Sequence, residues 1–206
     1  MSAAPPSTAS ASAFEPVWQI AELYPYQGEW TVEDYLAIPG NRLIEFDHGR
    51  VEFLAMPTQF HQIILSTLHI LLNQYLNEQG IGIVLTAGMK VRTSEKTFRE
   101  PDLVVMLHEN AHKRGEQFWE GADMAVEIVS PDDPQRDLVL KREEYAACGI
   151  REYWIVDPRD QSIAVLTLEQ SGARYQEAGR YRTGETAVSV LLDGFAAHVD
   201  EVFARR

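Results

Sequence analysis

The chain has 206 residues, 45% of them hydrophobic and 24% charged, which is typical of a globular domain with a core of its own. Its formal net charge of −13 argues against binding nucleic acid through a broad basic surface, because such affinity comes from neutralising phosphates. The charge does not exclude a nuclease, since a bound metal ion can supply positive charge at the site itself.

The first thirteen residues are rich in Ala, Ser and Pro, and they lack the charged start and apolar core of a secretory signal. We expect residues 1–13 to form a disordered tail and residues 14–206 to form a single domain. The single cysteine, Cys148, cannot form an intramolecular disulfide, and no apolar run reaches the roughly 18 to 20 residues of a membrane span. The expected compartment is the cytoplasm.

Apolar periodicity and turn residues predict the elements of the first half of the chain. In chain order they are a short helix from Thr31 to Pro39, two strands at 42–46 and 50–55 around a turn at 47–49, a long helix over 58–78 that ends at Gly80, and a strand over 82–91. The long helix carries the strongest pattern, because its apolar residues recur every three or four positions.

The second half of the chain alternates strands with one further helix. The pattern predicts strands at 102–107 and 124–130, a helix over 135–147 that ends at Gly149, a strand at 152–156, a hairpin of 163–168 and 173–181, a last strand at 188–192 and a weak helix over 198–206. The polar loop after the first of these strands carries His108 and His112, which we interpret as solvated because no further zinc ligand lies nearby. This order of elements predicts an α/β or α+β fold with a central mixed sheet flanked by helices.

Two carboxylates lie in the apolar strands of the second half. Asp102 follows Pro101 at the start of one strand, and Glu127 lies between apolar neighbours in the other. An isolated buried charge is costly, so such a carboxylate is paired, hydrogen-bonded or bound to a metal. If the strands are neighbours, Asp102, Glu127 and the backbone carbonyl of Ile128 can hold one Mg²⁺ or Mn²⁺ ion. Structural roles remain open, since Asp102 could cap a turn and Glu127 could be paired by an arginine such as Arg99.

Lys141 lies on the next predicted helix, fourteen positions after Glu127. A lysine beside a bound metal ion can orient or help to deprotonate the attacking water, and it can stabilise the charge that develops on a phosphoryl group. Two acids and one lysine around a metal ion therefore predict phosphodiester hydrolysis, with Asp102, Glu127 and Lys141 as the catalytic residues. Lys141 also lies four positions after Asp137, which is the spacing of a surface ion pair on a helix and gives the alternative interpretation.

Four segments of the chain together carry a known pattern. They are residues 43–51 (LIEFDHGRV), His61 at the start of the long helix, residues 99–105 (REPDLVV), and residues 126–131 (VEIVSP), which continue through Asp137, Lys141 and Tyr145 to 149–158 (GIREYWIVDP). In these segments the chain resembles the Uma-two family of the PD-(D/E)XK nuclease superfamily. The resemblance extends over roughly residues 31–192.

The resemblance implies a restriction-endonuclease-like core and metal-dependent cleavage of DNA. Asp102 matches the acid of the "PD" element, and Glu127 matches the second acid. The superfamily pattern places a lysine two residues after that acid, where this chain has Val129. In this family the lysine stands on the following helix, which is the position of Lys141.

Two further residues match the family pattern as accessory positions. Glu45 matches an acid before the turn at 47–49, although this turn is one residue longer than usual, and the residue could serve the metal or the structure. His61 could reach the site from the helix start, or it could cap and pack the helix.

Two classes of function follow from the sequence. The first is a DNA endonuclease that acts as a homodimer, because a duplex cutter needs one site per strand and two-fold pairing is the commonest assembly. The second is a catalytically silent module with a nuclease fold that binds nucleic acid or a protein partner, which the acidic charge and the displaced lysine favour. A hydrolase of another phosphodiester is a third possibility.

Overall fold

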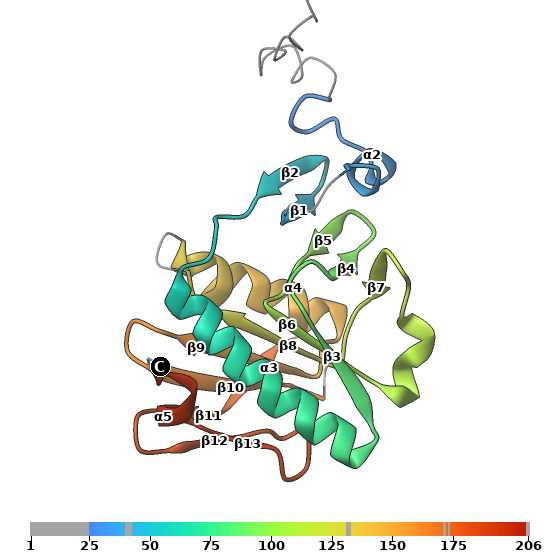
Figure 1. Ribbon diagram of the computed structural model, residues 1–206. Coiled ribbons are helices and arrows are strands. Elements are labelled where there is room, and N and C mark those ends of the chain that lie inside the picture. Colours follow the sequence, from blue (N-terminus) through green and yellow to red (C-terminus); the bar gives the residue numbers. More distant parts are fainter. Residues whose placement is uncertain (1–24, 40–42, 131–132, 171, 173, 205–206) are drawn as a thin grey trace, which may run out of the picture.

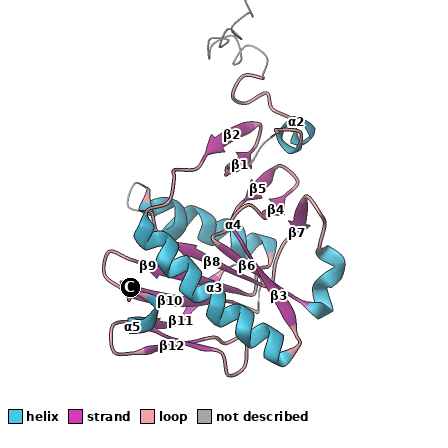
Figure 2. Cartoon of the chain, in the orientation of Figure 1, coloured by secondary structure: helices cyan, strands magenta, loops and turns pink. Residues whose placement is uncertain are grey.

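The computed structural model describes residues 25–39, 43–130, 133–170, 172 and 174–204 (Figure 1). The expected tail at 1–13 lies outside the described residues. The described chain folds into a six-stranded and a five-stranded sheet with helices packed against them, and a two-stranded ribbon follows near the C-terminal end (Figure 2). This is the mixed α/β architecture that the sequence predicts.

The six-stranded sheet is mixed and has the order β11-β10-β9-β8-β6-β3. Only β8 and β9 run parallel, and the other neighbours are antiparallel. Its strands are β3 (Gly82–Thr86), β6 (Leu103–Leu107), β8 (Met124–Ile128), β9 (Glu152–Asp157), β10 (Ser162–Leu168) and β11 (Tyr175–Tyr181).

The central strands are apolar on both faces because a helix covers each face (Figure 1). Along β8, Val126 packs into the cluster that contains the buried side of α3 (Gln59–Gln79), whereas Ala125 packs into the cluster that contains Tyr145 of α4 (Lys141–Cys148). The strand period of two residues thus divides the core into two layers.

Both helices begin or end where the sequence predicts. The Thr58 hydroxyl accepts a hydrogen bond from the backbone N–H of His61 at 3.2 Å, and Gly80 ends α3 at a φ of 63°. Gly149 ends α4 at a φ of 84°. Before α4, the segment η2 (Arg136–Leu140) winds as a π-helical turn. No helix in the described part of the chain is long and apolar enough to cross a membrane.

The five-stranded sheet has the order β2-β1-β5-β4-β7 and lies above the larger sheet in Figure 1. Its strands are β1 (Ile44–Asp47), β2 (Arg50–Phe53), β4 (Lys90–Ser94), β5 (Thr97–Arg99) and β7 (Phe118–Glu120). The short helix α2 (Val32–Leu36) closes a small apolar cluster over it, in which the ring of Tyr35 stacks on Phe46 at 5.2 Å between centroids. This sheet places Glu45 3.4 Å from Nζ of Lys141, on the helix that covers one face of the larger sheet.

The structure divides the strand expected over 82–91. A turn at Ala87 and Gly88 separates β3 from β4, and these two strands belong to different sheets. Gly88 takes a φ of 102°, a conformation that glycine adopts without strain. The short strands β5 and β7 were not expected, because each has only three residues and carries no alternation of its own.

Smaller differences lie elsewhere in the chain. The polar loop after β6 winds as a 3₁₀ helix, η1 (His108–Lys113). The strand expected at 188–192 is wrong for most of its length, because β12 (Thr186–Val188) shares only Val188 with it; β12 pairs with β13 (Ala196–His198). The last helix is limited to α5 (Val199–Val202). Apolar burial against α3 explains the position of α5, whose Val199 and Val202 join the core beneath that helix.

Candidate active site

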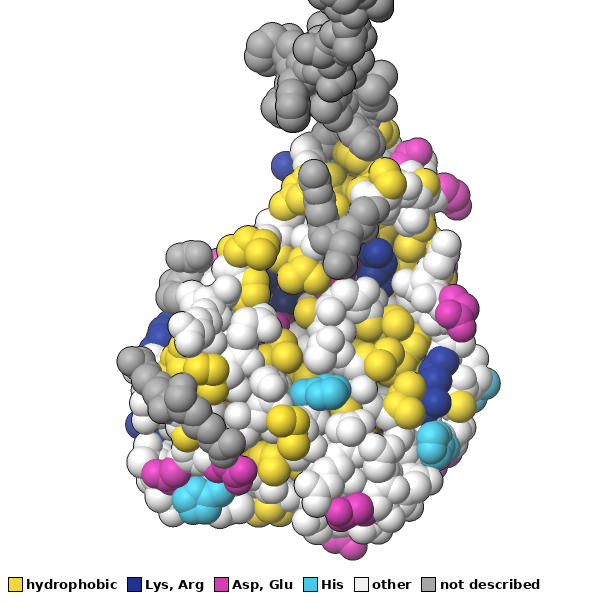
Figure 3. Space-filling model, viewed as in Figure 1, with side chains coloured by type: hydrophobic (Ala, Val, Ile, Leu, Met, Phe, Trp, Pro, Cys, Tyr) yellow, Lys and Arg dark blue, Asp and Glu magenta, His cyan; other side chains and the backbone are white. Residues whose placement is uncertain are grey.

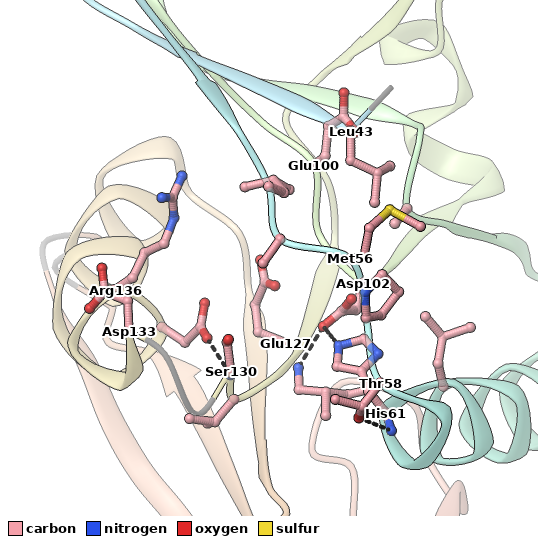
Figure 4. Close-up of a pocket in the computed structure, with 18 of the residues that line it drawn as sticks. Leu43, Met56, Thr58, His61, Glu100, Asp102, Glu127, Ser130, Asp133 and Arg136 are labelled. Carbon is pink, nitrogen blue, oxygen red and sulfur yellow. Dashed lines mark hydrogen bonds and ion pairs between the residues drawn. The ribbon is translucent and has the colours of Figure 1, made fainter. Parts of the chain in front are cut away.

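A cavity of about 530 Å³ opens between the start of α3, the end of β8 and the turn η2. Figure 4 shows Thr58 and His61 on one side of this cavity and Asp133 and Arg136 on the other, with Asp102 and Glu127 between them. The segment of residues 54–58, which links β2 to α3, forms a further wall.

Asp102 lies directly before β6, and it reaches across to the neighbouring strand. Its Oδ2 atom accepts a hydrogen bond from the backbone N–H of Ile128 at 2.8 Å. Leu103 of β6 pairs with Val126 of β8, so the next position along the antiparallel register sets Asp102 opposite Glu127. The structure thus brings both acids and Ile128 to one cavity.

Glu127 is buried, with an exposed fraction of 3%. Its Oε1 atom accepts a hydrogen bond from the hydroxyl of Tyr145 at 2.6 Å and lies 2.9 Å from Nζ of Lys141. Burial raises the pKa of Glu127 to about 8, and the nearby carboxylates of Asp137 and Asp102 act in the same direction against the ammonium of Lys141. The site therefore holds more negative charge than its buried lysine offsets.

Lys141 points its amine into the protein at the first turn of α4 and is 3% exposed. Besides Glu127, its Nζ atom lies 3.3 Å from Asp137 and 3.4 Å from Glu45. Burial acts to lower the pKa of Lys141, but the three carboxylates raise it well above its usual range, so the amine stays protonated. The ion pair with Asp137 exists, but it is buried and is one of three rather than a surface pair.

Glu45 of β1 is completely buried and lies behind Lys141 rather than on the cavity wall. Arg136 binds its carboxylate, the backbone N–H of Glu100 donates to it at 3.2 Å, and Arg99 lies 3.5 Å away. Burial would raise the pKa of Glu45, but Lys141, Arg136 and Arg99 together lower it. Glu45 thus contacts three cationic side chains, those of Lys141, Arg136 and Arg99, and can hold them in place.

Arg99, which could have paired with Glu127, is placed elsewhere. It donates two hydrogen bonds to Glu144, at 2.5 and 2.6 Å, and forms its weaker contact with Glu45. Glu127 is satisfied instead by Tyr145 and Lys141.

The ring of His61 lies in the site, while its backbone N–H donates to the hydroxyl of Thr58 at the start of α3. The Nε2 atom lies 3.2 Å from Oδ2 of Asp102, and in Figure 4 the ring faces that carboxylate. The buried Nδ1 atom has no hydrogen-bond partner among the described residues. The ring can therefore fix the orientation of Asp102.

Four residues of the site were missed as functional candidates from the sequence: Asp137, Arg136, Tyr145 and Glu100. Glu100 lines the cavity beside Asp102, and burial raises its pKa to about 7 with a smaller contribution from Glu45. Glu100, Asp137 and Tyr145 lie in the segments that carry the family resemblance, and this was the signal for three of them. No sequence pattern marked Arg136, because its partners Glu45 and Glu52 lie far away in the sequence, on the five-stranded sheet.

The donor chemistry of the cavity fits a hard divalent cation. Among the described residues, no three His, Cys, Asp or Glu side chains form a ready-made metal cluster. Mg²⁺ nevertheless needs few protein ligands, since it keeps several waters, and the carboxylates of Asp102 and Glu127 with the carbonyl of Ile128 supply oxygen donors in one cavity. A cation there would favour the ionised form of Glu127 and so oppose the burial and the neighbouring carboxylates that raise its pKa.

Comparison with known proteins supports the pattern seen in the sequence. The family model Uma2, described as "Putative restriction endonuclease", matches residues 32–200. The chain belongs to the Uma2 family. The resemblance drawn from the sequence is thereby confirmed. The match covers every Uma2-like residue discussed above, from Glu45 to Lys141.

The Uma2 chain also shares its fold with a solved structure. This is the crystal structure of a "putative nuclease belonging to DUF820" from Anabaena variabilis ATCC 29413. The TM-score is 0.69 at 20% sequence identity, and the alignment covers 84% of this chain and 97% of the other. At this identity the likeness shows a common fold. No curated protein matches the chain.

Proposed function

We propose that this Uma2-family protein is a divalent-metal-dependent endodeoxyribonuclease that hydrolyses phosphodiester bonds. The observation that carries the proposal is the buried amine of Lys141, 2.9 Å from Glu127 and in the same cavity as Asp102. Burying a lysine among carboxylates is costly unless the charges are well matched, and such strongly shifted groups gather at functional sites.

Each residue has a distinct proposed role. Asp102, Glu127 and the carbonyl of Ile128 would hold Mg²⁺ or Mn²⁺, and the bound ion supplies positive charge and lowers the pKa of a coordinated water. Lys141 remains protonated, so it acts as a fixed positive charge rather than as a base. His61 orients Asp102 through its ring nitrogen.

In hydrolysis the oxygen of water bonds to phosphorus, the bond from phosphorus to the leaving ester oxygen breaks, and that oxygen ends with a proton that comes from the water. Negative charge grows on the phosphoryl oxygens in the transition state. A fixed ammonium aimed at that position stabilises the transition state without reorganising at the moment of reaction. Glu45 and Asp137 keep the Lys141 amine in place, since both lie within 3.4 Å of it.

A cleavage assay tests the proposal. The protein is incubated with single-stranded and duplex DNA in EDTA, Mg²⁺ or Mn²⁺, beside Glu127→Gln as the matched inactive control. We expect cleavage that requires the metal and is lost in the variant. Absence of cleavage in both metals on both substrates, with a correctly folded protein, would refute it.

The alternative is a catalytically silent nuclease-fold module that binds nucleic acid or a protein. Two observations favour it: the net charge of −13, and Val129 at the position where the superfamily pattern has its lysine. The same assay decides, because such a module would bind DNA in a mobility-shift experiment without cutting it in any metal.

Cleavage of both strands of a duplex would require two active sites. If the substrate is a duplex, we propose that the protein acts as a homodimer. We also propose that it acts in the cytoplasm. Exposed apolar side chains lie outside the cavity at Val188 and Val190 of the β12 region and could form such an interface. Light scattering measures the mass, and a monomer at micromolar concentration would contradict the dimer.

A further inference from the structure

Large apolar side chains lie exposed on one wall of the cavity. Met56 and Phe53 line it with exposed fractions of 89% and 58%, and the half-buried Phe60 and Leu65 continue the wall from α3. In Figure 3 hydrophobic side chains gather around a hollow in which basic side chains are visible. Exposed apolar groups gathered at a cavity usually mark a binding surface rather than an accident of packing.

The charges of the same cavity are poorly suited to a duplex. Its wall carries six acidic residues: Glu52, Glu100, Asp102, Glu127, Asp133 and Asp137. The three basic residues of the wall are Lys141, Arg136 and Arg159, and each is already paired with a carboxylate. A protein grips duplex DNA mainly by neutralising many phosphates, which this surface cannot do, and a single strand can bind here only because its exposed bases add apolar contacts that a duplex does not offer.

An unpaired strand offers what this surface can bind. Its bases expose flat apolar faces beside the phosphate backbone, whereas a duplex keeps those faces stacked inside. The apolar wall of residues 53–60 borders the carboxylates that are proposed to hold the metal. A strand could therefore place its bases against Phe53 and Met56 while one phosphate lies near Asp102 and Glu127.

We infer that the substrate of this site is unpaired DNA, whose bases stack on the ring of Phe53 and contact the side chain of Met56, while Phe60, packed on Phe203, borders this wall. The inference rests on the proposed nuclease function and deepens it by naming the substrate class. Base stacking tolerates any sequence, so the wall provides affinity without base-specific recognition. One site then suffices for each cut, and cleavage needs no dimer.

The test compares one oligonucleotide as a single strand and as a blunt duplex. Binding is measured by fluorescence anisotropy with the Glu127→Gln protein, and cleavage is measured with the active protein in Mg²⁺. Both are repeated with Phe53→Ala/Met56→Ala, and with Ile70→Ala as the control, since Ile70 is 60% exposed on α3 but lies outside the cavity. Melting curves confirm that each variant is folded.

We expect single strands to bind and be cut in preference to the duplex. The double variant should weaken single-strand binding about tenfold or more and raise KM with little change in kcat, because stacking is lost while the carboxylates remain. Ile70→Ala should match the parent protein.

Three results would overturn the inference. The first is that the duplex is bound and cut as well as the single strand, or better. The second is that the double variant binds the single strand with unchanged affinity. The third is that the double variant changes the oligomeric mass in solution, which would make the wall an interface between copies of the chain. Binding is measured on an inactive protein, so these outcomes are read separately from a failure to cleave, which would refute the proposed function itself.

Discussion

The Nζ atom of Lys141 lies 2.9 Å from Oε1 of Glu127, although the residues are fourteen positions apart and the π-helical turn η2 lies between them. The amine of Lys141 also contacts Asp137 of η2 and Glu45 of β1 in the five-stranded sheet. The pair with Glu127 therefore does not depend on β8 and α4 alone. The geometry of the site thus depends on the packing of the two sheets.

Replacing Lys141 with Met should reduce metal-dependent cleavage about 10²- to 10³-fold, because the variant lacks the fixed charge that is proposed to stabilise the transition state. The same change leaves Glu127, Glu45 and Asp137 without their shared cation, which costs about 3 to 5 kcal/mol of stability. Rates are therefore measured at a temperature where circular dichroism shows the variant folded. Lys141→Arg retains the charge and serves as the control for stability. Near-normal kcat in folded Lys141→Met would contradict the role.

Replacing Glu45 with Gln should destabilise the protein by about 3 to 5 kcal/mol, because Arg136, Arg99 and Lys141 would lose a completely buried partner. Urea denaturation measures the change. Glu52→Gln is the matched control: Glu52 binds the same Arg136 but its side chain is 60% exposed, so its loss should cost at most about 1 kcal/mol. Equal effects of the two variants would show that Glu45 is not a special anchor.

His61 offers a test of positioning. His61→Ala removes the ring that lies 3.2 Å from Asp102, and if Asp102 holds the metal as proposed, loss of this partner should weaken metal affinity or activity about 10- to 100-fold. His112→Ala, on the exposed η1 segment, provides the control. The Mg²⁺ concentration that gives half-maximal cleavage should rise for His61→Ala alone. If it is the same in both variants, the contact with Asp102 is incidental.

The expected tail gives a simple stability prediction. Residues 1–13 are rich in Ala, Ser and Pro and carry no apolar period. Deleting them should leave Tm unchanged within error in a thermal melt. A drop of several degrees would mean that this segment packs on the domain.

Local signals in the sequence predict the long elements well. Thr58 and Gly80 bound α3, and Gly149 ends α4, because caps and glycine act within a few residues. The strand expected over 82–91 shows the limit of such signals. The expected strand contains β3 and only the first two residues of β4, Lys90 and Val91, and only the pairing of β3 with β6 and of β4 with β5 reveals that the chain passes from one sheet to the other at the turn between them.

The site shows the same limit. Asp102 and Glu127 stand out because an acid in an apolar strand is unusual, and Lys141 follows from the family pattern. The alternative for Lys141, a surface pair with Asp137, rested on spacing alone, which carries no information on burial. Arg136 is invisible to local reasoning, because its partner Glu45 lies 91 positions away.

Glu127 should make the stability of the metal-free protein depend on pH. Its pKa is about 8 in the folded chain against an ordinary value of 4.5, because burial disfavours the charged carboxylate. Between these values the folded state binds more protons than the unfolded state. The contribution of Glu127 to stability is therefore fully present below about pH 4.5 and is lost as the pH rises through about 8, with a slope of at most about 1.4 kcal/mol per pH unit.

Urea denaturation in EDTA, from pH 5 to pH 8.5, measures this effect against Glu127→Gln, which cannot ionise at that position. The free energy of unfolding of the parent protein should fall relative to that of the variant as the pH rises. Mg²⁺ should reverse the trend at the upper end of the range, because a cation beside Asp102 and Glu127 favours the ionised carboxylate and its binding releases a proton. Calorimetry in two buffers of different ionisation enthalpy counts that proton. A difference between parent and variant that is independent of both pH and Mg²⁺ would remove Glu127 from the metal site.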